Sequence, residues 1–327
     1  MCPQLEVMSC PVCLSPAIIP LAFVGRDLLF ETTSKTFNLS ACKGCHCFFI
    51  DPLPGSQELA SFYPTQYWWS TSPGLLKFLE STYRKIVLRD HIGFIAKATA
   101  SVRNRPARLL DIGCGTGTLL ASLKQRGFQV SGFDSSRAAA RVANTENGVD
   151  VFVGERLQDA SFHDASFDIV TLFHVLEHVS DPRSILAEVH RILQPSGRVV
   201  LQVPNIESWQ SRLFGKHWYG LDVPRHLINY SGRSMRHLLS DSGFRILRVR
   251  HFNMRDNAPA LASSLFPSLD PVSRRARQQQ RQTTEHAAVA WVKHAAFFAT
   301  VVLATPFAIA ESLAGNGGTL MLEAERI

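Results

Sequence analysis

The stretch of sequence that decides the fold is residues 108–120, which read Arg-Leu-Leu-Asp-Ile-Gly-Cys-Gly-Thr-Gly-Thr-Leu-Leu. The apolar half predicts a buried parallel strand, and the glycines after it let the backbone turn tightly and approach a ligand closely. The spacing G-x-G-x-G differs from the G-x-G-x-x-G of dinucleotide sites, so it argues against a nicotinamide or flavin ligand. Asp111, near the end of the strand, suits an ammonium group better than a pyrophosphate. We therefore expect a cofactor site of another kind.

Strands and helices alternate after this stretch. Asp181 and Pro182 form an N-cap and first-turn pair, and they begin a helix with an apolar stripe. The alternation predicts an α/β fold built on a doubly wound, mostly parallel sheet of seven strands. We expect the last strand to close the sheet as an antiparallel edge. Besides the strand in 108–120, the predicted strands are 128–133, 149–153, 168–173, 198–203, 244–252 and Thr319–Arg326.

These elements resemble the class I S-adenosylmethionine-dependent methyltransferases, which have a Rossmann-like fold. The matching motifs are L-L-D-I-G-C-G-T-G, the acid Asp134 after the second strand, F-D-I-V-T-L-F-H-V-L-E-H-V and L-Q-P-S-G-R-V-V-L. The resemblance implies S-adenosylmethionine as the cofactor, with Asp134 on its ribose and Asp111 near its amine. It also implies that three glycines lie along the methionine moiety and that a leucine flanks the adenine: Gly113, Gly115, Gly117 and Leu157.

Two pairs of cysteines near the start, Cys10 with Cys13 and Cys42 with Cys45, each have the spacing C-x2-C. Two such turns brought together supply the four thiolates that structural zinc prefers, so we expect a zinc ribbon with Zn²⁺ on these residues. Cys47 is a less well spaced substitute ligand. The alternatives are a redox pair and a ribbon without metal. A zinc ribbon ahead of such a domain resembles bacterial methyltransferases of glycan and natural-product pathways.

Candidate catalytic residues follow the fourth strand, at the carboxyl edge where doubly wound sheets bind ligands. A carboxylate beside an imidazole holds its tautomer and raises its basicity, so we predict His178 as general base with Glu177 beside it. His226, after the fifth strand, would assist proton transfer. Two alternatives stay open. His178 could cap the strand edge or contact the cofactor, or His174, Glu177 and His178 could hold a metal ion together.

Positive charge is concentrated in residues 208–256, which contain nine Arg and Lys against three Asp, in a chain with a net charge of +7. Such a region indicates either an anionic substrate or surface, or an ordinary solvated face. Arg225 is predicted to grip a phosphate or carboxylate of the acceptor, with an ion pair to Asp222 as the alternative. Tyr67, or alternatively Tyr63, is predicted to overhang the substrate. The other interpretation is that these aromatic residues only fasten the ribbon to the next domain.

The chain divides into five parts on these features. We expect a zinc-ribbon-like module over 1–52, an aromatic linker and helix over 53–104, the cofactor-binding core over 105–254, a helical apolar insert over 255–318 and the last strand over 319–327. The insert is far longer than an ordinary connection, so it should have a structure and a function.

The uncharged run of this insert, 295–310, contains Pro306 and is shorter than the about 20 residues that span a bilayer. We predict that 274–313 lie at a membrane surface, with the arginines of 274–281 on acidic headgroups. The alternative is a buried lid or a dimer contact.

Together these features predict S-adenosylmethionine-dependent methyl transfer to the oxygen or carbon of an anionic small molecule that is sugar- or lipid-linked. The alternatives are a ubiquinone-type O-methyltransferase, a zinc-containing nucleic-acid methyltransferase and a non-catalytic cofactor-binding scaffold. We expect no nucleic-acid partner, because no N-P-P-Y-like motif follows the fourth strand. The clustered cysteines and the absence of an apolar leader predict a cytoplasmic protein with peripheral membrane association.

Overall fold

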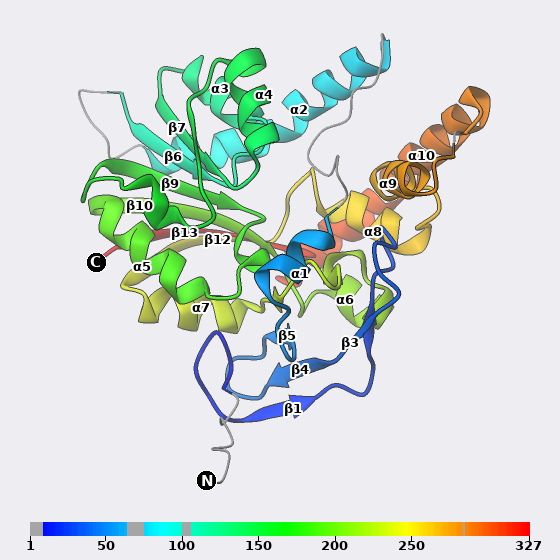
Figure 1. The fold of residues 1–327 in the computed structure, drawn as a ribbon, viewed down its shortest axis with the longest axis horizontal. Coiled ribbons are helices and arrows are strands. Elements are labelled where there is room, and N and C mark those ends of the chain that lie inside the picture. Colours follow the sequence, from blue (N-terminus) through cyan, green and yellow to red (C-terminus); the bar gives the residue numbers. More distant parts are fainter. Residues whose placement is uncertain (1–8, 64–74, 100–105, 284) are drawn as a thin grey trace.

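The computed structural model describes residues 9–63, 75–99, 106–283 and 285–327. Its main feature is a seven-stranded sheet with the strand order β12-β13-β10-β9-β6-β7-β8 (Figure 1), so the predicted α/β fold is confirmed. The order reverses between β6 and β9, and a sheet of this type binds ligands beside the reversal, at the carboxyl ends of its strands. The strands are β6 (Arg108–Ile112), β7 (Gln129–Asp134), β8 (Val151–Val153), β9 (Phe167–Phe173), β10 (Leu193–Pro204), β12 (Phe244–Arg250) and β13 (Thr319–Arg326).

The last strand lies inside the sheet. β13 runs antiparallel to both neighbours, and its Leu322 pairs with Leu201 of β10 and with Val249 of β12. The prediction that this strand forms the edge is therefore wrong. β12 takes the edge, because every second side chain along it is exposed, whereas six consecutive residues of β13 are buried. A strand that is solvated on one side tolerates the unpaired backbone groups of an edge.

Successive side chains of the strands point to opposite faces and build two cores. Leu109 and Ile169 pack with residues of α2 and α3 on one face. Leu110 and Val170 pack with residues of α5 and α7 on the other. Figure 1 shows α2, α3 and α4 to one side of the sheet and α5 and α7 to the other. These helices are α2 (Leu75–Ala98), α3 (Thr118–Lys124), α4 (Arg137–Asn147), α5 (Pro182–Ile192) and α7 (Gly232–Asp241).

The cysteine-rich module contains a second, four-stranded sheet with the order β1-β4-β5-β11. β11 belongs to the C-terminal part of the chain and pairs antiparallel with β5, so the module is joined to the core through a shared sheet. Its Ile50 and the core residue Leu227 also share one hydrophobic cluster. The elements are β1 (Ile18–Pro20), β2 (Gly25–Arg26), β3 (Thr36–Phe37), β4 (Leu39–Cys42), β5 (Phe48–Ile50), α1 (Ser56–Ser61) and β11 (Ile228–Asn229).

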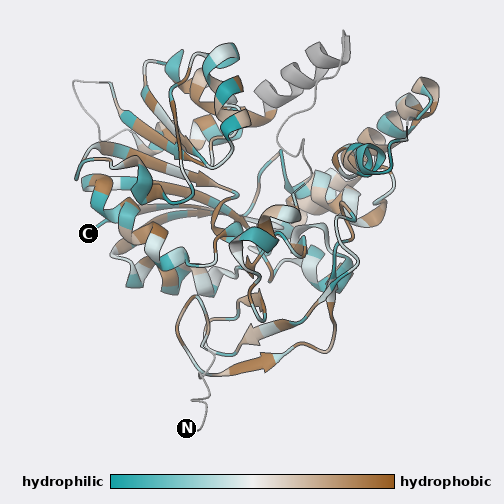
Figure 2. Cartoon of the chain, viewed as in Figure 1, coloured by the Kyte–Doolittle hydropathy of each residue, from teal (hydrophilic) through white to brown (hydrophobic). Residues whose placement is uncertain are grey.

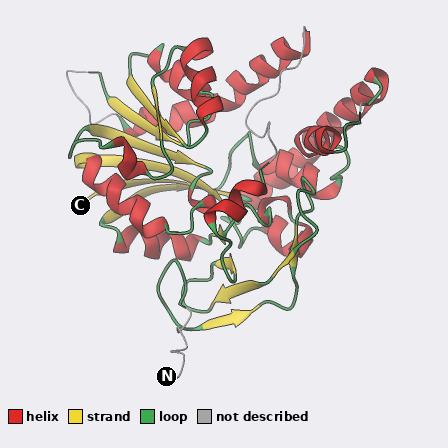
Figure 3. Cartoon of the chain, viewed as in Figure 1, coloured by secondary structure: helices red, strands yellow, loops and turns green. Residues whose placement is uncertain are grey.

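The insert between β12 and β13 is helical, as predicted. It forms α8 (Asn257–Leu265), α9 (Pro271–Gln280) and α10 (Ala287–Leu313), which lie together at the right of the view in Figure 3. Figure 2 shows a largely hydrophilic α9 beside a more hydrophobic α10. α10 continues through Pro306 for 27 residues, so it is longer than its uncharged run suggested. The remaining short helices are η1 (Leu157–Ala160), η2 (Leu176–His178), α6 (Trp209–Phe214), η3 (Gly215–His217) and η4 (Tyr219–Leu221).

Candidate active site

The glycine-rich loop between β6 and α3 has a left-handed backbone at three positions. The φ angle is 71° at Gly113, 54° at Gly115 and 71° at Gly117. A Cβ on Gly113 would lie 2.6 Å from Val175 Cγ2, whereas one on Gly115 would meet nothing within 4 Å. The loop therefore needs glycine for its conformation and faces open space at Gly115, as a backbone that receives a ligand must.

Two buried acids, Asp111 and Asp134, lie at the carboxyl ends of β6 and β7. Asp134 holds the glycine loop, because its Oδ2 accepts a hydrogen bond from the Gly115 amide at 2.8 Å and its Oδ1 accepts one from the Ser136 amide at 2.8 Å. Asp111 Oδ1 accepts a hydrogen bond from the Thr171 hydroxyl at 2.6 Å. Burial raises the pKa of both carboxyl groups, that of Asp111 to about 7. An ammonium group near Asp111 would favour its charged form.

Two further residues, Leu157 and Tyr67, are predicted to contact a ligand, and the structure describes one of them. Leu157 begins η1 with 3% of its surface exposed, inside the core cluster. Its exposure is close to that of Asp134, at 4%, and of Asp111, at 5%, so its place beside the adenine stays a prediction. Tyr67, predicted to overhang the substrate, lies outside the described residues.

A pair of histidines lies beside the glycine loop, with ring centroids 4.8 Å apart. His178, in η2, has its Nδ1 3.0 Å from the carbonyl oxygen of Arg225 and 2.9 Å from the hydroxyl of Tyr63. His226 has its Nδ1 2.8 Å from the carbonyl oxygen of Gly220. A carbonyl oxygen can only accept, so both Nδ1 atoms carry the proton and both Nε2 atoms keep a lone pair in the neutral rings. The pKa of His178 is lowered to about 4, mainly because the ring is buried and secondly because of the charge of His226.

Glu177 lies against this pair with a fully buried side chain. Its Oε1 is 3.1 Å from His174 Nδ1, and its Oε2 has no hydrogen-bond partner among the described residues. Burial alone would raise the pKa of Glu177, but the hydrogen bond and charge of His174 outweigh it and lower the pKa. One side-chain ligand atom from each of Glu177, His178 and His226 lies within 4.8 Å of the others, close enough to share a metal ion.

His174 is not part of this group, which corrects the metal-binding alternative. Its Nε2 lies 3.4 Å from Asp256 Oδ2 and 3.0 Å from Gln202 Nε2. Burial would lower the pKa of His174, but Asp256 and Glu177 outweigh it and raise the pKa to about 9. His174 is therefore a charged partner of two carboxylates, Glu177 and Asp256.

Arg225 is a buried cross-link, and the prediction that it grips the acceptor is wrong. The side chain is 0% exposed. Its Nη2 donates to Asp27 Oδ1 at 2.7 Å and to Asp222 Oδ1 at 2.5 Å, and its Nη1 donates to Asp27 Oδ2 at 3.0 Å and to the Phe62 carbonyl at 3.1 Å. The fifth N–H, on Nε, donates to Asp222 Oδ1 at 3.0 Å. All donors of the guanidinium are thus used inside the protein.

A pocket of about 180 Å³ lies between the ribbon and the segment that carries η3 and η4. Exposed Arg26, Lys216 and His217 line it. The segment from Trp218 to Val223 lines the same pocket and includes Gly220, whose carbonyl holds His226. The pocket therefore offers positive charge near the histidine pair, in place of Arg225.

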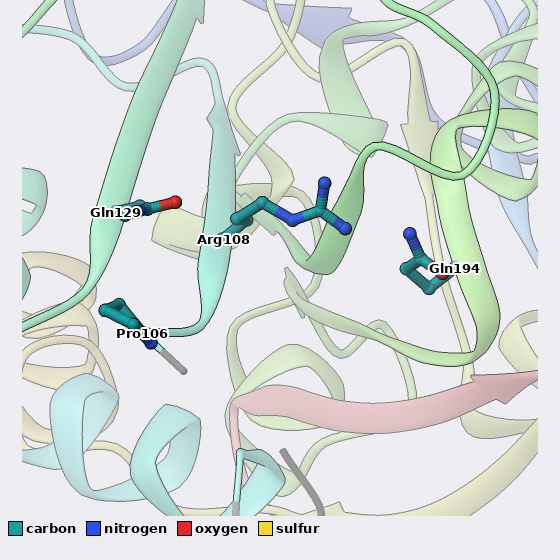
Figure 4. A pocket seen from close by; sticks show the side chains of 4 residues that line it. All are labelled: Pro106, Arg108, Gln129 and Gln194. Atoms are coloured by element: carbon teal, nitrogen blue, oxygen red, sulfur yellow. The ribbon is translucent and has the colours of Figure 1, made fainter. Parts of the chain in front are cut away.

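A second hollow, of about 420 Å³, opens at the amino ends of the central strands (Figure 4). It is lined by Arg108 and Gln129, the first residues of β6 and β7, with Pro106 and Gln194. Because ligands of such sheets bind at the carboxyl ends of the strands, this hollow at the amino ends is unrelated to the candidate active site.

The four predicted zinc ligands come together. One Sγ atom from each of Cys10, Cys13, Cys42 and Cys45 lies within 4.8 Å of the others, with 3.5 Å between Cys13 and Cys42 and 3.6 Å between Cys10 and Cys45. Zinc–sulfur bonds of about 2.3 Å in a tetrahedron require sulfur atoms about 3.8 Å apart, so the set fits Zn²⁺. Cys47, the substitute ligand, lies 3.4 Å from Cys10.

Sequence reasoning missed three residues of this region. Asp27 reaches Arg225 across 198 positions of sequence. Asp256, in the segment that follows β12, contacts His174. His91 of α2 packs edge-on against Phe173, with ring centroids 4.6 Å apart. No local pattern marks these pairs, because each joins segments that only the fold brings together.

Comparisons with known proteins agree with this geometry. A family model described as a methyltransferase domain matches residues 75–249. A ubiquinone biosynthesis O-methyltransferase of Cronobacter sakazakii is 32% identical over 177 residues, which cover 52% of this chain and 70% of that protein. One of Pseudomonas aeruginosa is 40% identical over 103 residues, 30% of this chain and 44% of that protein. A solved S-adenosylmethionine-dependent methyltransferase from Archaeoglobus fulgidus is 17% identical, with a TM-score of 0.48 over 77% of this chain and 100% of that one.

Proposed function

The chain belongs to the family of class I S-adenosylmethionine-dependent methyltransferases, and we propose that it methylates an oxygen or carbon of an anionic small molecule, sugar- or lipid-linked. One observation supports the proposal above the others. The histidine pair His178 and His226 clusters with the carboxylate of Glu177, and Val175, the residue before η2, lies against Gly113 of the glycine loop. Acid–base groups therefore lie beside the predicted cofactor site.

The cofactor would lie along the glycine loop at the carboxyl ends of β6 and β7. Bound S-adenosylmethionine supplies an electrophilic methyl group on its sulfonium sulfur. Gly115 offers an open backbone for its methionine part, and Asp111 offers a carboxylate for its ammonium. Asp134 keeps lone pairs for the ribose hydroxyls while it holds the loop. Positioning of the two reactants supplies most of the acceleration in such a transfer.

His178 is the proposed general base. Its lowered pKa leaves the ring neutral at pH 7, and its Nδ1–H donates to the Arg225 carbonyl, so Nε2 is the atom that accepts the proton. The carboxylate of Glu177 raises the pKa of His178 in opposition to burial, and it would stabilise the imidazolium that forms. His226 lies against the same ring and would orient it or take the proton onward.

The acceptor's negative charge would lie in the pocket lined by Arg26, Lys216 and His217. This pocket replaces Arg225 in the proposal, because the guanidinium of Arg225 is fully used by the protein. The zinc ion, held by Cys10, Cys13, Cys42 and Cys45, would be structural, since four thiolates fill its coordination and leave no position for water.

The test measures S-adenosylhomocysteine formation with three acceptors, a nucleotide sugar, a catechol and an RNA oligonucleotide. We expect turnover with the nucleotide sugar, and about 10²–10⁴-fold less turnover in His178→Ala with unchanged cofactor affinity. His163→Ala, at an exposed loop, is the matched control. Turnover of the catechol would favour the ubiquinone-type alternative, and turnover of RNA the nucleic-acid alternative. Cofactor binding without any turnover would favour a scaffold.

A metal-assisted reaction is the second candidate, because Glu177 Oε2 has no partner among the described residues and one ligand atom from each of Glu177, His178 and His226 lies within 4.8 Å of the others. Activity that disappears on dialysis against EDTA, returns with Fe²⁺ and is not restored in Glu177→Gln would assign Glu177, His178 and His226 to a metal ion. Activity that survives the chelator supports the direct base.

A further inference from the structure

The long helix of the insert, α10, is hardly covered by the rest of the protein. Over its 27 residues only Ala304, Ala308 and Glu311 are buried, and it is long and apolar enough to cross a membrane by length and composition. At about 1.5 Å per residue it extends for about 40 Å. Leu303 is 80% exposed. The exposed large apolar side chains of α10 are Val289, Trp291, Val292, Phe298, Val302, Leu303, Phe307, Ile309 and Leu313.

Several charged side chains of this region pair with one another between α9 and α10. Lys293 Nζ lies 2.5 Å from Glu285 Oε1, and Arg274 Nε lies 3.3 Å from Glu285 Oε2. Arg274 Nη2 is 3.0 Å from His294 Nδ1. The third ionisable residue of α10, Glu311, is buried against Gln210. α10 therefore turns polar groups toward α9 and exposes an apolar face, whereas a surface helix in water exposes its polar face.

The apolar surface continues onto the body of the protein at α6. The rings of Trp209 and Phe307 have centroids 6.0 Å apart, and Leu213 of α6 is 66% exposed. Arg212 and Lys216, on the same segment, are also exposed. A positively charged border thus lies beside the apolar face.

The prediction that the arginines of 274–281 lie on acidic headgroups stays a prediction, and two of these arginines also have a partner within the protein. Arg277 Nη1 lies 3.3 Å from Glu31 Oε1 of the ribbon, and Arg281 pairs with the same carboxylate. The single carboxylate of Glu31 offsets one of these two positive charges. α9 is thereby fastened to the ribbon, while β13, after α10, lies inside the main sheet. Both ends of the α10 segment belong to one body, so α10 cannot pass to the other side of a bilayer.

We propose that the exposed face of α10, with Trp209 and Leu213, inserts into the surface of an acidic phospholipid bilayer, and that Arg212 and Lys216 bind its headgroups. An apolar face without a charged group along it suits the acyl boundary of a bilayer, and basic residues at its border suit anionic lipid.

The test is flotation of the full-length protein with vesicles of phosphatidylcholine alone or mixed with phosphatidylglycerol. Wild type should float with both and more strongly with the mixture. The double variant Phe298→Glu, Leu303→Glu should stay in the bottom fraction, whereas the control Leu247→Glu, an exposed leucine of β12, should float as wild type does. Removing Arg212 or Lys216 should lower binding to the acidic vesicles by about fivefold for each charge, and leave binding to phosphatidylcholine unchanged.

Wild type that floats with neither vesicle overturns the proposal, and so does a double variant that still floats. Calorimetric titration with S-adenosylmethionine shows whether the double variant is folded; if it is not, the single variant Leu303→Glu replaces it. If wild type is a dimer that becomes monomeric in the double variant and neither protein floats, the face binds a second copy and the proposal is wrong. Flotation needs no methyl acceptor, so this result is independent of the proposed activity.

Discussion

Arg225→Met removes the cation that lies between Asp27 and Asp222 and keeps a side chain of similar length. The guanidinium is fully buried and donates to both carboxylates, so the variant leaves two buried carboxylates without a counter-ion. Breaking one buried ion pair by removing a partner costs about 3–5 kcal/mol, because the remaining charge stays desolvated. We therefore expect the free energy of unfolding to fall by about 4 kcal/mol, mainly through loss of the tie between ribbon and core.

Urea denaturation followed by tryptophan fluorescence measures this change. Glu58→Gln is the matched control, because its ion pair with Lys35 also involves the ribbon but is exposed at both ends. Such pairs contribute about 0–1 kcal/mol. If Arg225→Met costs no more than the control, the reasoning is refuted. Arg225 would then again be a candidate for binding the acceptor.

Three further predictions concern the cofactor, the metal and acid stability. Asp134→Ala should weaken S-adenosylmethionine binding, measured by calorimetry, by about 1.5–3 kcal/mol, because a charge-assisted hydrogen bond is lost; unchanged affinity would remove Asp134 from the cofactor site. Elemental analysis should find about one zinc per chain, less in Cys42→Ala but not in Cys114→Ala, and a wild type without metal would contradict the ribbon. Burial would raise the pKa of Asp27, but the adjacent guanidinium outweighs it and lowers the pKa. The pKa of an Asp in the unfolded chain is about 3.9, and the pKa of Asp27 in the folded protein is lower. The ionised carboxylate therefore stabilises the fold fully when the pH is above about 3.9, and this stabilisation is lost as the pH falls through the folded-state pKa. The stability difference between wild type and Asp27→Asn should therefore be constant from pH 7 to 5 and shrink below about pH 4; a constant difference at lower pH would show that Asp27 is not responsible.

The parts of the fold that depend on local sequence could be predicted. The run 108–120 carries its strand, its turn and its glycines together, and Asp181 with Pro182 begins α5 where expected. β13 was located at the right residues but in the wrong place in the sheet. Which of the two strands lies at the edge could be predicted only by comparing the burial of β13 with that of β12, and the sequence pattern of one strand alone does not show this.

The candidate site was predictable where its residues are neighbours and not where the fold joins distant segments. Glu177 and His178 are adjacent in sequence, and they lie together in the structure. Arg225 was misjudged because one of its two carboxylates, Asp27, comes from the ribbon. The proton positions on the histidine pair could not be predicted either, since they depend on two backbone carbonyls of a loop.

The sheet that the ribbon shares with the core also determines when the ribbon can finish folding during synthesis. The cysteines leave the ribosome first, and domains generally begin to fold from the N-terminus as they emerge. β5, however, receives its partner only when Ile228 and Asn229 are available. Until then the nascent ribbon presents an unpaired strand, which is a template for unwanted pairing with other chains. A ribbon expressed alone would keep that open strand permanently, so it is not a faithful substitute for the ribbon in the full chain.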